Sequence, residues 1–190
     1  MPAKKAAKKA AKKMAKKSPQ HLPSHDLRRA YEHLGRVDIL EGALAGTHFV
    51  QVSALATLAQ QQLAAGHARG AADLLRAAEH ICFAALAPED RPGAVAMVSP
   101  ELKSAIAAEL NRLTSHAEER WTESESDEDQ AHETIAAIFG AALDLAAAAF
   151  ARGAYRPALE LARAAEALAH VDTRFSTGVS DGRRAERLAS

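Results

Sequence analysis

The stretch LAAGHARGAADLLRAAE at residues 63–79 decides the fold, because a related stretch, FARGAYRPALELARAAE, follows at residues 150–166. The two stretches align without a gap. Four of the matched positions hold a glycine or a charged residue, Gly66/Gly153, Arg69/Arg156, Arg76/Arg163 and Glu79/Glu166. Alanine bias does not produce such matches, so we interpret the body of the chain as an internal duplication.

A second correspondence lies upstream of each copy. Ser24-His25-Asp26-Leu27 and Ser99-Pro100-Glu101-Leu102 both present a serine, then an acid, then the first leucine of an apolar face. Serine is a preferred N-cap residue, and a negative charge is favourable in the first helical turn. Each pattern therefore predicts the start of a helix. The acidic run from Thr122 to about His132 supplies most of the extra length of the second copy.

Helical spacing of apolar residues predicts six helices, at residues 24–45, 48–65, 68–87, 100–121, 130–152 and 155–170. Gly46, Gly66 and Gly153 stand where helix C-terminal caps belong. The first predicted hairpin should bury Leu55, Leu58, Leu63, Leu74, Leu75 and Ile81. The second should bury Ile135, Ile138, Phe139, Leu143, Leu145 and Phe150.

The predicted fold class is all-α, with two related three-helix units that form one helical bundle or a short solenoid. The first unit takes residues 23–88 and the second takes residues 99–170, including an acidic loop at 122–129. Residues 89–98, which contain Pro92, are predicted to link them. A disordered Lys/Ala-rich tail at residues 1–22 and a loosely ordered tail at 171–190 complete the domain organisation.

The two hairpins resemble the tetratricopeptide repeat over about 35 residues each. The first copy carries the resemblance in Leu55, Leu58, Ala59, Gly66, Ala71, Leu75 and Ala78, and the second in Leu145, Ala146, Gly153, Tyr155, Ala158 and Ala165. The resemblance implies antiparallel helix pairs that dock a protein partner or another copy of the chain. A generic alanine-rich α-bundle explains the same residues.

The N-terminal tail concentrates positive charge. Eight of the nine lysines are packed into residues 4–17, and the remaining 173 residues hold 16 basic and 24 acidic groups, so a tail of +8 precedes a body of −8. Such asymmetry predicts a basic arm for a polyanion. The predicted nucleic-acid-binding residues are Lys4, Lys5, Lys8, Lys9, Lys12, Lys13, Lys16 and Lys17. No aromatic residue interleaves them, so we expect no base stacking and no sequence readout.

This tail resembles the lysine- and alanine-rich tails of linker histones and bacterial histone-like proteins. The resemblance covers about the first 20 residues and implies non-specific binding through phosphate neutralisation. Two other interpretations stay open. The tail could be a solubilising arm, or it could contact the acidic loop at 122–129 of its own chain, which would then compete with nucleic acid.

Other sites are not predicted. Cys82 is the only cysteine, which excludes an intramolecular disulfide and fits a reducing compartment. The nine histidines lack the spacing of known metal motifs, and phosphate-binding, dinucleotide and nucleophile-elbow motifs are missing. We therefore expect no catalytic residues, no cofactor, no metal and no small-molecule substrate. With no membrane-spanning or secretory segment in evidence, a cytoplasmic location follows as the default, with nucleoid association if the tail binds DNA.

The sequence thus predicts a helical-repeat interaction protein with a non-specific nucleic-acid-binding tail. The alternative is a tetratricopeptide-repeat-like adaptor or chaperone module whose tail only solubilises it. An enzyme with an unrecognised pocket is the third hypothesis, and it is disfavoured.

Overall fold

The structure is a computed structural model that describes residues 24–87, 98–122 and 130–171. All regular secondary structure in these ranges is α-helical, so the all-α prediction is confirmed. The helices are α2 (His25–Glu41), α3 (Gly46–Ala64), α4 (Ala68–Ala85), α5 (Pro100–Thr122) and α6 (Gln130–Ala151). A last helix over residues 155–171, called the final helix below, follows α6.

The two predicted serine caps begin α2 and α5. The Ser24 hydroxyl oxygen accepts a hydrogen bond from the backbone N–H of Leu27 at 3.2 Å, and Ser99 accepts one from Leu102 at the same distance. An acidic residue occupies the first turn of each helix. In α5 that residue is Glu101, whose pKa is lowered first by a backbone hydrogen bond and then by Ser99. Local sequence is therefore sufficient to start both helices.

Glycine in the left-handed region ends two of the helices, as predicted. Gly66 follows α3 with φ of 84° and Gly153 follows α6 with φ of 85°, a conformation that costs glycine nothing. Each glycine lets the chain reverse into the next helix. The two short turns therefore make antiparallel pairs of α3 with α4 and of α6 with the final helix.

The first helix is shorter than predicted. We expected it to reach residue 45, with Gly46 after its end, but α2 stops at Glu41 and Gly42 is its C-cap. The N–H groups of Ala43 and Leu44 bond to carbonyls only three residues back, which tightens the chain into a turn. Gly46, with φ of 64°, is instead the first residue of α3.

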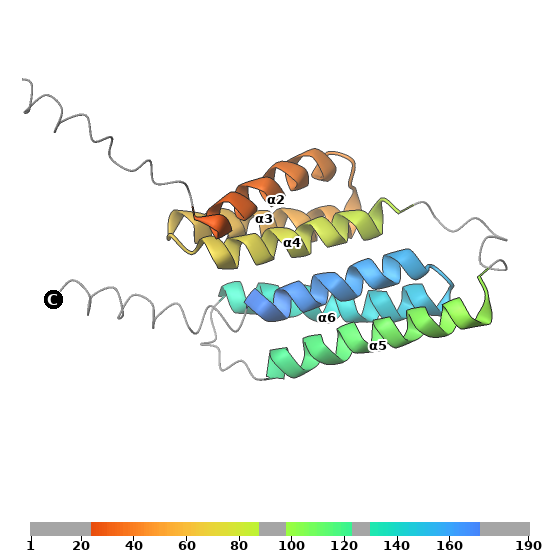
Figure 1. Cartoon of the computed structure of the whole chain (residues 1–190). Coiled ribbons are helices and arrows are strands. Elements are labelled where there is room, and N and C mark those ends of the chain that lie inside the picture. The colour runs from red at the N-terminus through yellow and green to blue at the C-terminus, as the bar shows by residue number, and fades with distance from the viewer. Residues whose placement is uncertain (1–23, 88–97, 123–129, 172–190) are drawn as a thin grey trace, which may run out of the picture.

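The helices stack in layers (Figure 1). The α3–α4 pair and the pair of α6 with the final helix face each other across the centre of the molecule. On the outer side of the first pair lies α2, which packs mainly on α4. On the outer side of the second pair lies α5. The centre of the molecule is consequently built from four helices of two sequence-distant hairpins.

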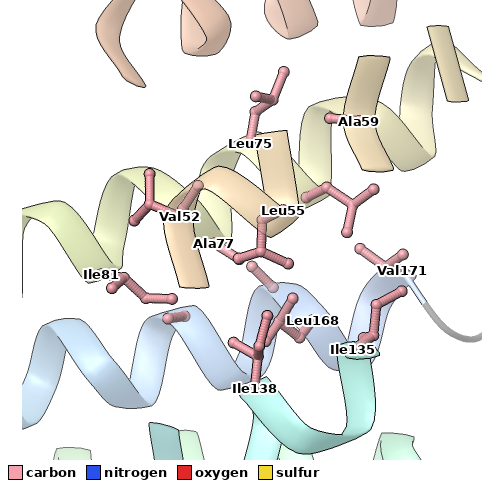
Figure 2. Close-up of a cluster of buried hydrophobic side chains, with 14 of the residues drawn as sticks. Val52, Leu55, Ala59, Leu75, Ala77, Ile81, Ile135, Ile138, Leu168 and Val171 are labelled. Atoms are coloured by element: carbon pink, nitrogen blue, oxygen red, sulfur yellow. The ribbon is translucent and has the colours of Figure 1, made fainter. Parts of the chain in front are cut away.

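Side chains from both hairpins meet in one apolar core (Figure 2). Val52 and Leu55 of α3 and Ile81 of α4 point toward Ile138 of α6 and Leu168 of the final helix. Seven of the residues predicted to be buried are buried, namely Leu55, Leu74, Leu75, Ile81, Ile135, Ile138 and Phe139. The other five are only partly buried, namely Leu58, Leu63, Leu143, Leu145 and Phe150.

Alanine allows the helices to approach closely. The final helix alone buries eight alanines and leucines, Ala158, Leu161, Ala162, Ala164, Ala165, Ala167, Leu168 and Ala169. Alanine buries little apolar area, so most of the hydrophobic stabilisation must come from the larger core residues. Close approach also brings polar side chains of neighbouring helices within hydrogen-bonding distance, and these contacts form the polar sites described next.

Candidate functional site

The eight lysines predicted to bind nucleic acid lie outside the described residues, as does the acidic stretch 123–129. The described residues contain the helical body to which both segments are attached. Two features of this body are described below: three histidine–glutamate contacts between helices, and an open apolar surface of α3.

The three histidine–glutamate contacts share one geometry. In each, the histidine Nδ1 atom faces a carboxylate oxygen of another helix: His33 to Glu79 at 2.5 Å, His80 to Glu160 at 2.7 Å, and His116 to Glu166 at 2.9 Å. The partners are 46, 80 and 50 residues apart in sequence, respectively. Each contact therefore fixes one helix against a sequence-distant neighbour.

The first contact holds α2 on α4. Glu79 is buried, with 6% of its surface exposed. Its Oε2 atom meets His33 Nδ1, and its Oε1 atom accepts from Arg36 Nη1 at 3.2 Å. His33 and Arg36 are three residues apart and so lie on one face of α2. Because a buried carboxylate is costly unless its oxygens are bonded, these two donors set the rotation of α2 on α4.

The contact of His116 with Glu166 holds α5 on the final helix. Arg120 Nε donates to His116 Nε2 at 3.0 Å. A guanidinium group can only donate, so His116 Nε2 must be an acceptor and its proton must sit on Nδ1. His116 Nδ1 therefore donates to Glu166. The ring of His170 meets the His116 ring edge-on, with centroids 6.0 Å apart.

The contact of His80 with Glu160 joins the two hairpins. His80 is on α4 and Glu160 is on the final helix, and both side chains are mostly buried. Arg163 Nη1 donates to the second oxygen of Glu160 at 3.1 Å. The hydrogen bond from His80 is the largest cause that lowers the pKa of Glu160, and the positive charges of Arg163 and Arg156 act in the same direction. The carboxylate is thus ionised where the two halves of the core meet.

Metal-binding groups and the cysteine thiol were the other candidates for a site. Within the described residues, no group of three or more His, Cys, Asp or Glu side chains could hold a metal ion. Cys82 is buried, and desolvation, followed by the nearby Glu41 and Glu79 carboxylates, raises its pKa to about 11. A thiol with so high a pKa is protonated at neutral pH and is a poor nucleophile.

Trp121 is half-buried at the end of α5, where it packs against the core. Its ring stacks on Phe139 of α6, with centroids 4.4 Å apart and planes 11° apart, and also on His132 at 5.4 Å and 18°. A lone tryptophan at the end of a helix can pack against its neighbours or anchor a partner. The stacking supplies the first role, because it ties α5 to α6 next to the acidic stretch.

One surface of α3 was missed by sequence reasoning. It lines an open depression of about 410 Å³ together with Thr134 of α6. The α3 residues are Phe49, Val50, Ser53, Ala54, Thr57 and Leu58, and we call them the α3 face. The available signal was that the 19 residues of α3 contain no Asp, Glu, Lys or Arg. Every other helix in the described residues carries at least two such charges.

The stretch Ala131–Ala151 is long and apolar enough to cross a membrane by length and composition alone. Its Ile135, Ile138, Phe139 and Ala142 are buried against other helices, and 33% of the stretch is buried inside the structure. Comparison of this chain with protein-family models, with curated proteins and with solved structures finds no match.

Proposed function

We propose that this protein binds nucleic acid or a similar polyanion through Lys4–Lys17, without sequence preference, and that its helical body makes protein contacts. One observation carries the proposal: eight of the nine lysines fall within 14 consecutive residues ahead of a body with a net charge of −8. Clustered ammonium groups displace condensed counterions from a phosphate backbone, and this displacement drives non-specific binding. The role is that of a cytoplasmic, DNA- or RNA-associated protein.

The ion pairs of the body support the assignment of phosphate binding to the tail. Four arginines of the body donate hydrogen bonds to side chains of the same chain, namely Arg36, Arg112, Arg120 and Arg163. Arg28 forms an ion pair with Glu32 at 3.7 Å. An arginine that already donates to a carboxylate is a weaker phosphate ligand, because the internal bond must first be broken. Because the body has a net charge of −8 and the tail one of +8, the tail is the part of the chain that attracts phosphate.

We further propose that the body is a duplicated pair of three-helix units with tetratricopeptide-repeat-like hairpins. Two observations support this. Gly66 and Gly153 adopt the same positive φ in the two hairpins. The aligned residues Glu79 and Glu166 each hold a histidine of the helix that precedes the hairpin, His33 and His116. The two histidines have different offsets from their glutamates, so their equivalence is spatial.

The alternative function is that of a protein–protein adaptor with a merely solubilising tail. The observation that favours it is the α3 face, which exposes 43% of Phe49 and 64% of Val50. Contiguous apolar surface on a small protein is typical of interaction sites. The two functions differ in what the tail does, so one experiment on the tail separates them.

That experiment is a salt series of duplex binding on the full chain and on a chain without residues 1–18. If all eight lysines meet phosphates, the slope of log K against log salt should be about −7. A chain with the eight lysines replaced by glutamine should not bind, whereas replacement by arginine, which keeps the charge, should preserve binding. Equal binding by the full and shortened chains would overturn the role of the tail. No binding by the full chain at low salt would overturn the proposal in favour of the adaptor.

A further inference from the structure

We propose that the α3 face is the docking site for a second copy of this chain, so that the protein forms a weak, two-fold symmetric dimer. This inference goes beyond the function proposed above and does not depend on it. It rests on the lack of charge along α3, on the exposure of its large side chains and on the order of residue sizes along the face.

The α3 face differs from other places where apolar residues are exposed. Ile39 and Tyr31 on α2 are exposed by 79% and 59%, but α2 also carries Arg28, Glu32 and Asp38. Single exposed apolar residues among charges are normal on a soluble protein. On α3 no charge interrupts Phe49, Val50 and the residues that follow, so the surface is uncharged along its length.

The polar members of the face are partly masked. The Thr57 hydroxyl donates to the backbone carbonyl of Ser53 at 2.9 Å. A hydroxyl bonded within its own helix no longer requires water as an acceptor. Thr57 can therefore present its methyl group to a partner, next to Ala54 and Leu58. An uncharged surface of this kind selects an uncharged partner surface, because a charged one would be desolvated without compensation.

The order of residue sizes makes the α3 face complementary to itself. Its residues form two adjacent rows with a spacing of four positions, Phe49–Ser53–Thr57 and Val50–Ala54–Leu58. Rows of this spacing are ridges on the surface of a helix. When a second α3 lies antiparallel across Ser53 and Ala54, Phe49 of one copy faces Leu58 of the other, and Val50 faces Thr57. The two small residues then sit at the centre, where close approach is needed. Because the pairing is two-fold symmetric, each of these side-chain contacts occurs twice in the interface.

The expected affinity is low. A helix of this length is about 28 Å long and its contact strip is about 10 Å wide, which gives an area of a few hundred Å² per copy. Stable protein interfaces bury about 800 Å² per partner. Even with a contribution from Thr134 and its neighbours on α6, the dimer should dissociate in the micromolar range or above. It would bring two lysine tails into one particle.

The test is sedimentation velocity on the full chain from about 1 to 500 μM in about 0.5 M salt, which screens attraction between the basic tail and the acidic body. The average mass should rise from 20.1 kDa toward twice that value. Val50→Glu should keep the protein monomeric, as should Thr57→Lys. Ile39→Glu, a change at a more exposed apolar residue on α2, should leave the dimer intact.

The register has its own test. A chain that carries both V50E and T57K should recover the dimer, because each introduced carboxylate faces an introduced amine of the other copy. Circular dichroism of each variant checks that the helices persist. A wild-type mass of one chain at every concentration would overturn the proposal, as would a dimer that V50E leaves unchanged. Val50-dependent binding to neutral lipid vesicles by an otherwise monomeric chain would also overturn it. None of these results involves nucleic acid, so a failure here is distinct from a failure of the proposed function.

Discussion

The Nδ1 atom of His80 lies 2.7 Å from Oε2 of Glu160, and this contact bridges α4 and the final helix at the centre of the molecule. The two residues are 80 positions apart in sequence. Both are mostly buried, so the carboxylate depends on His80 and Arg163 for its hydrogen bonds. The polar contact and the apolar core around it hold the same two hairpins together.

Loss of this histidine should destabilise the fold. We expect His80→Ala to reduce the free energy of unfolding by about 1–3 kcal/mol, because Glu160 loses a buried donor. The measurement is urea unfolding followed by circular dichroism. His25→Ala is the matched control, since 68% of the His25 side chain is exposed, and it should change stability by less than about 0.5 kcal/mol. Equal effects of the two changes would contradict a bridging role for His80.

The same contact predicts a pH dependence. The pKa of Glu160 in the folded protein is lowered from its ordinary value of 4.5, mainly by the hydrogen bond from His80. A lowered folded pKa contributes stability at pH values above the unfolded pKa, and the contribution is lost as the pH falls through the folded pKa. Wild type should therefore exceed Glu160→Gln in stability at pH 7. The difference should shrink as the pH drops below 4.5, and a constant difference down to pH 3 would be inconsistent with this cause.

The thiol of Cys82 should report on global opening. Burial and the neighbouring carboxylates raise its pKa to about 11, so the native protein at pH 8 holds little thiolate. A thiol-specific reagent should label the native chain at least about 100-fold more slowly than the unfolded chain. The readout is the absorbance of the coloured group that the reagent releases, followed with time. The chain unfolded in guanidinium gives the signal expected for one fully accessible thiol. Rapid native labelling would show that Cys82 is accessible.

The stack of Trp121 on Phe139 should control tryptophan emission. Phe139→Leu keeps an apolar side chain but removes the aromatic face, so we expect a loss of about 1 kcal/mol and a red shift of the Trp121 emission. Phe150→Leu is the control, because Phe150 contacts Tyr155 at 5.3 Å instead. It should leave the emission unchanged. A red shift in both variants would point to general loosening rather than to the stack.

The acidic stretch predicts competition with nucleic acid for the lysine tail. Exchange of the carboxylates of Glu123, Glu125, Asp127, Glu128 and Asp129 for amides should tighten duplex binding several-fold at low salt. The gain should disappear at about 0.5 M salt, where such attraction is screened. The same exchanges in a chain without residues 1–18 should have no effect. Unchanged affinity in the full chain would reject the competition.

Local sequence was sufficient for most of the secondary structure, because the signals act over a few residues. The serine caps at Ser24 and Ser99 and the glycine turns at Gly66 and Gly153 act within one or two helical turns. The exception, Gly46, shows the limit of such signals. A glycine can end one helix or begin the next, and here the tight turn at residues 42–45 decided between them.

The candidate sites were predicted unevenly. The lysine tail follows from composition alone, and it remains a prediction because those residues lie outside the described part of the chain. The α3 face was visible in the sequence as 19 residues without charge, but an uncharged helix is also what a fully buried helix looks like. Only the packing of α4 and α6 on the other side of α3 left Phe49 and Val50 exposed.

The sequence by itself determined that the chain is helical, where most helices begin and end, and that its charge is divided between a basic tail and an acidic body. Only the tertiary structure decided which histidine meets which glutamate and which helix surface is left uncovered. The physical reason is range: caps and turns depend on neighbours along the chain, whereas the pairing of His80 with Glu160 depends on how two hairpins rotate and slide until an alanine-rich core closes.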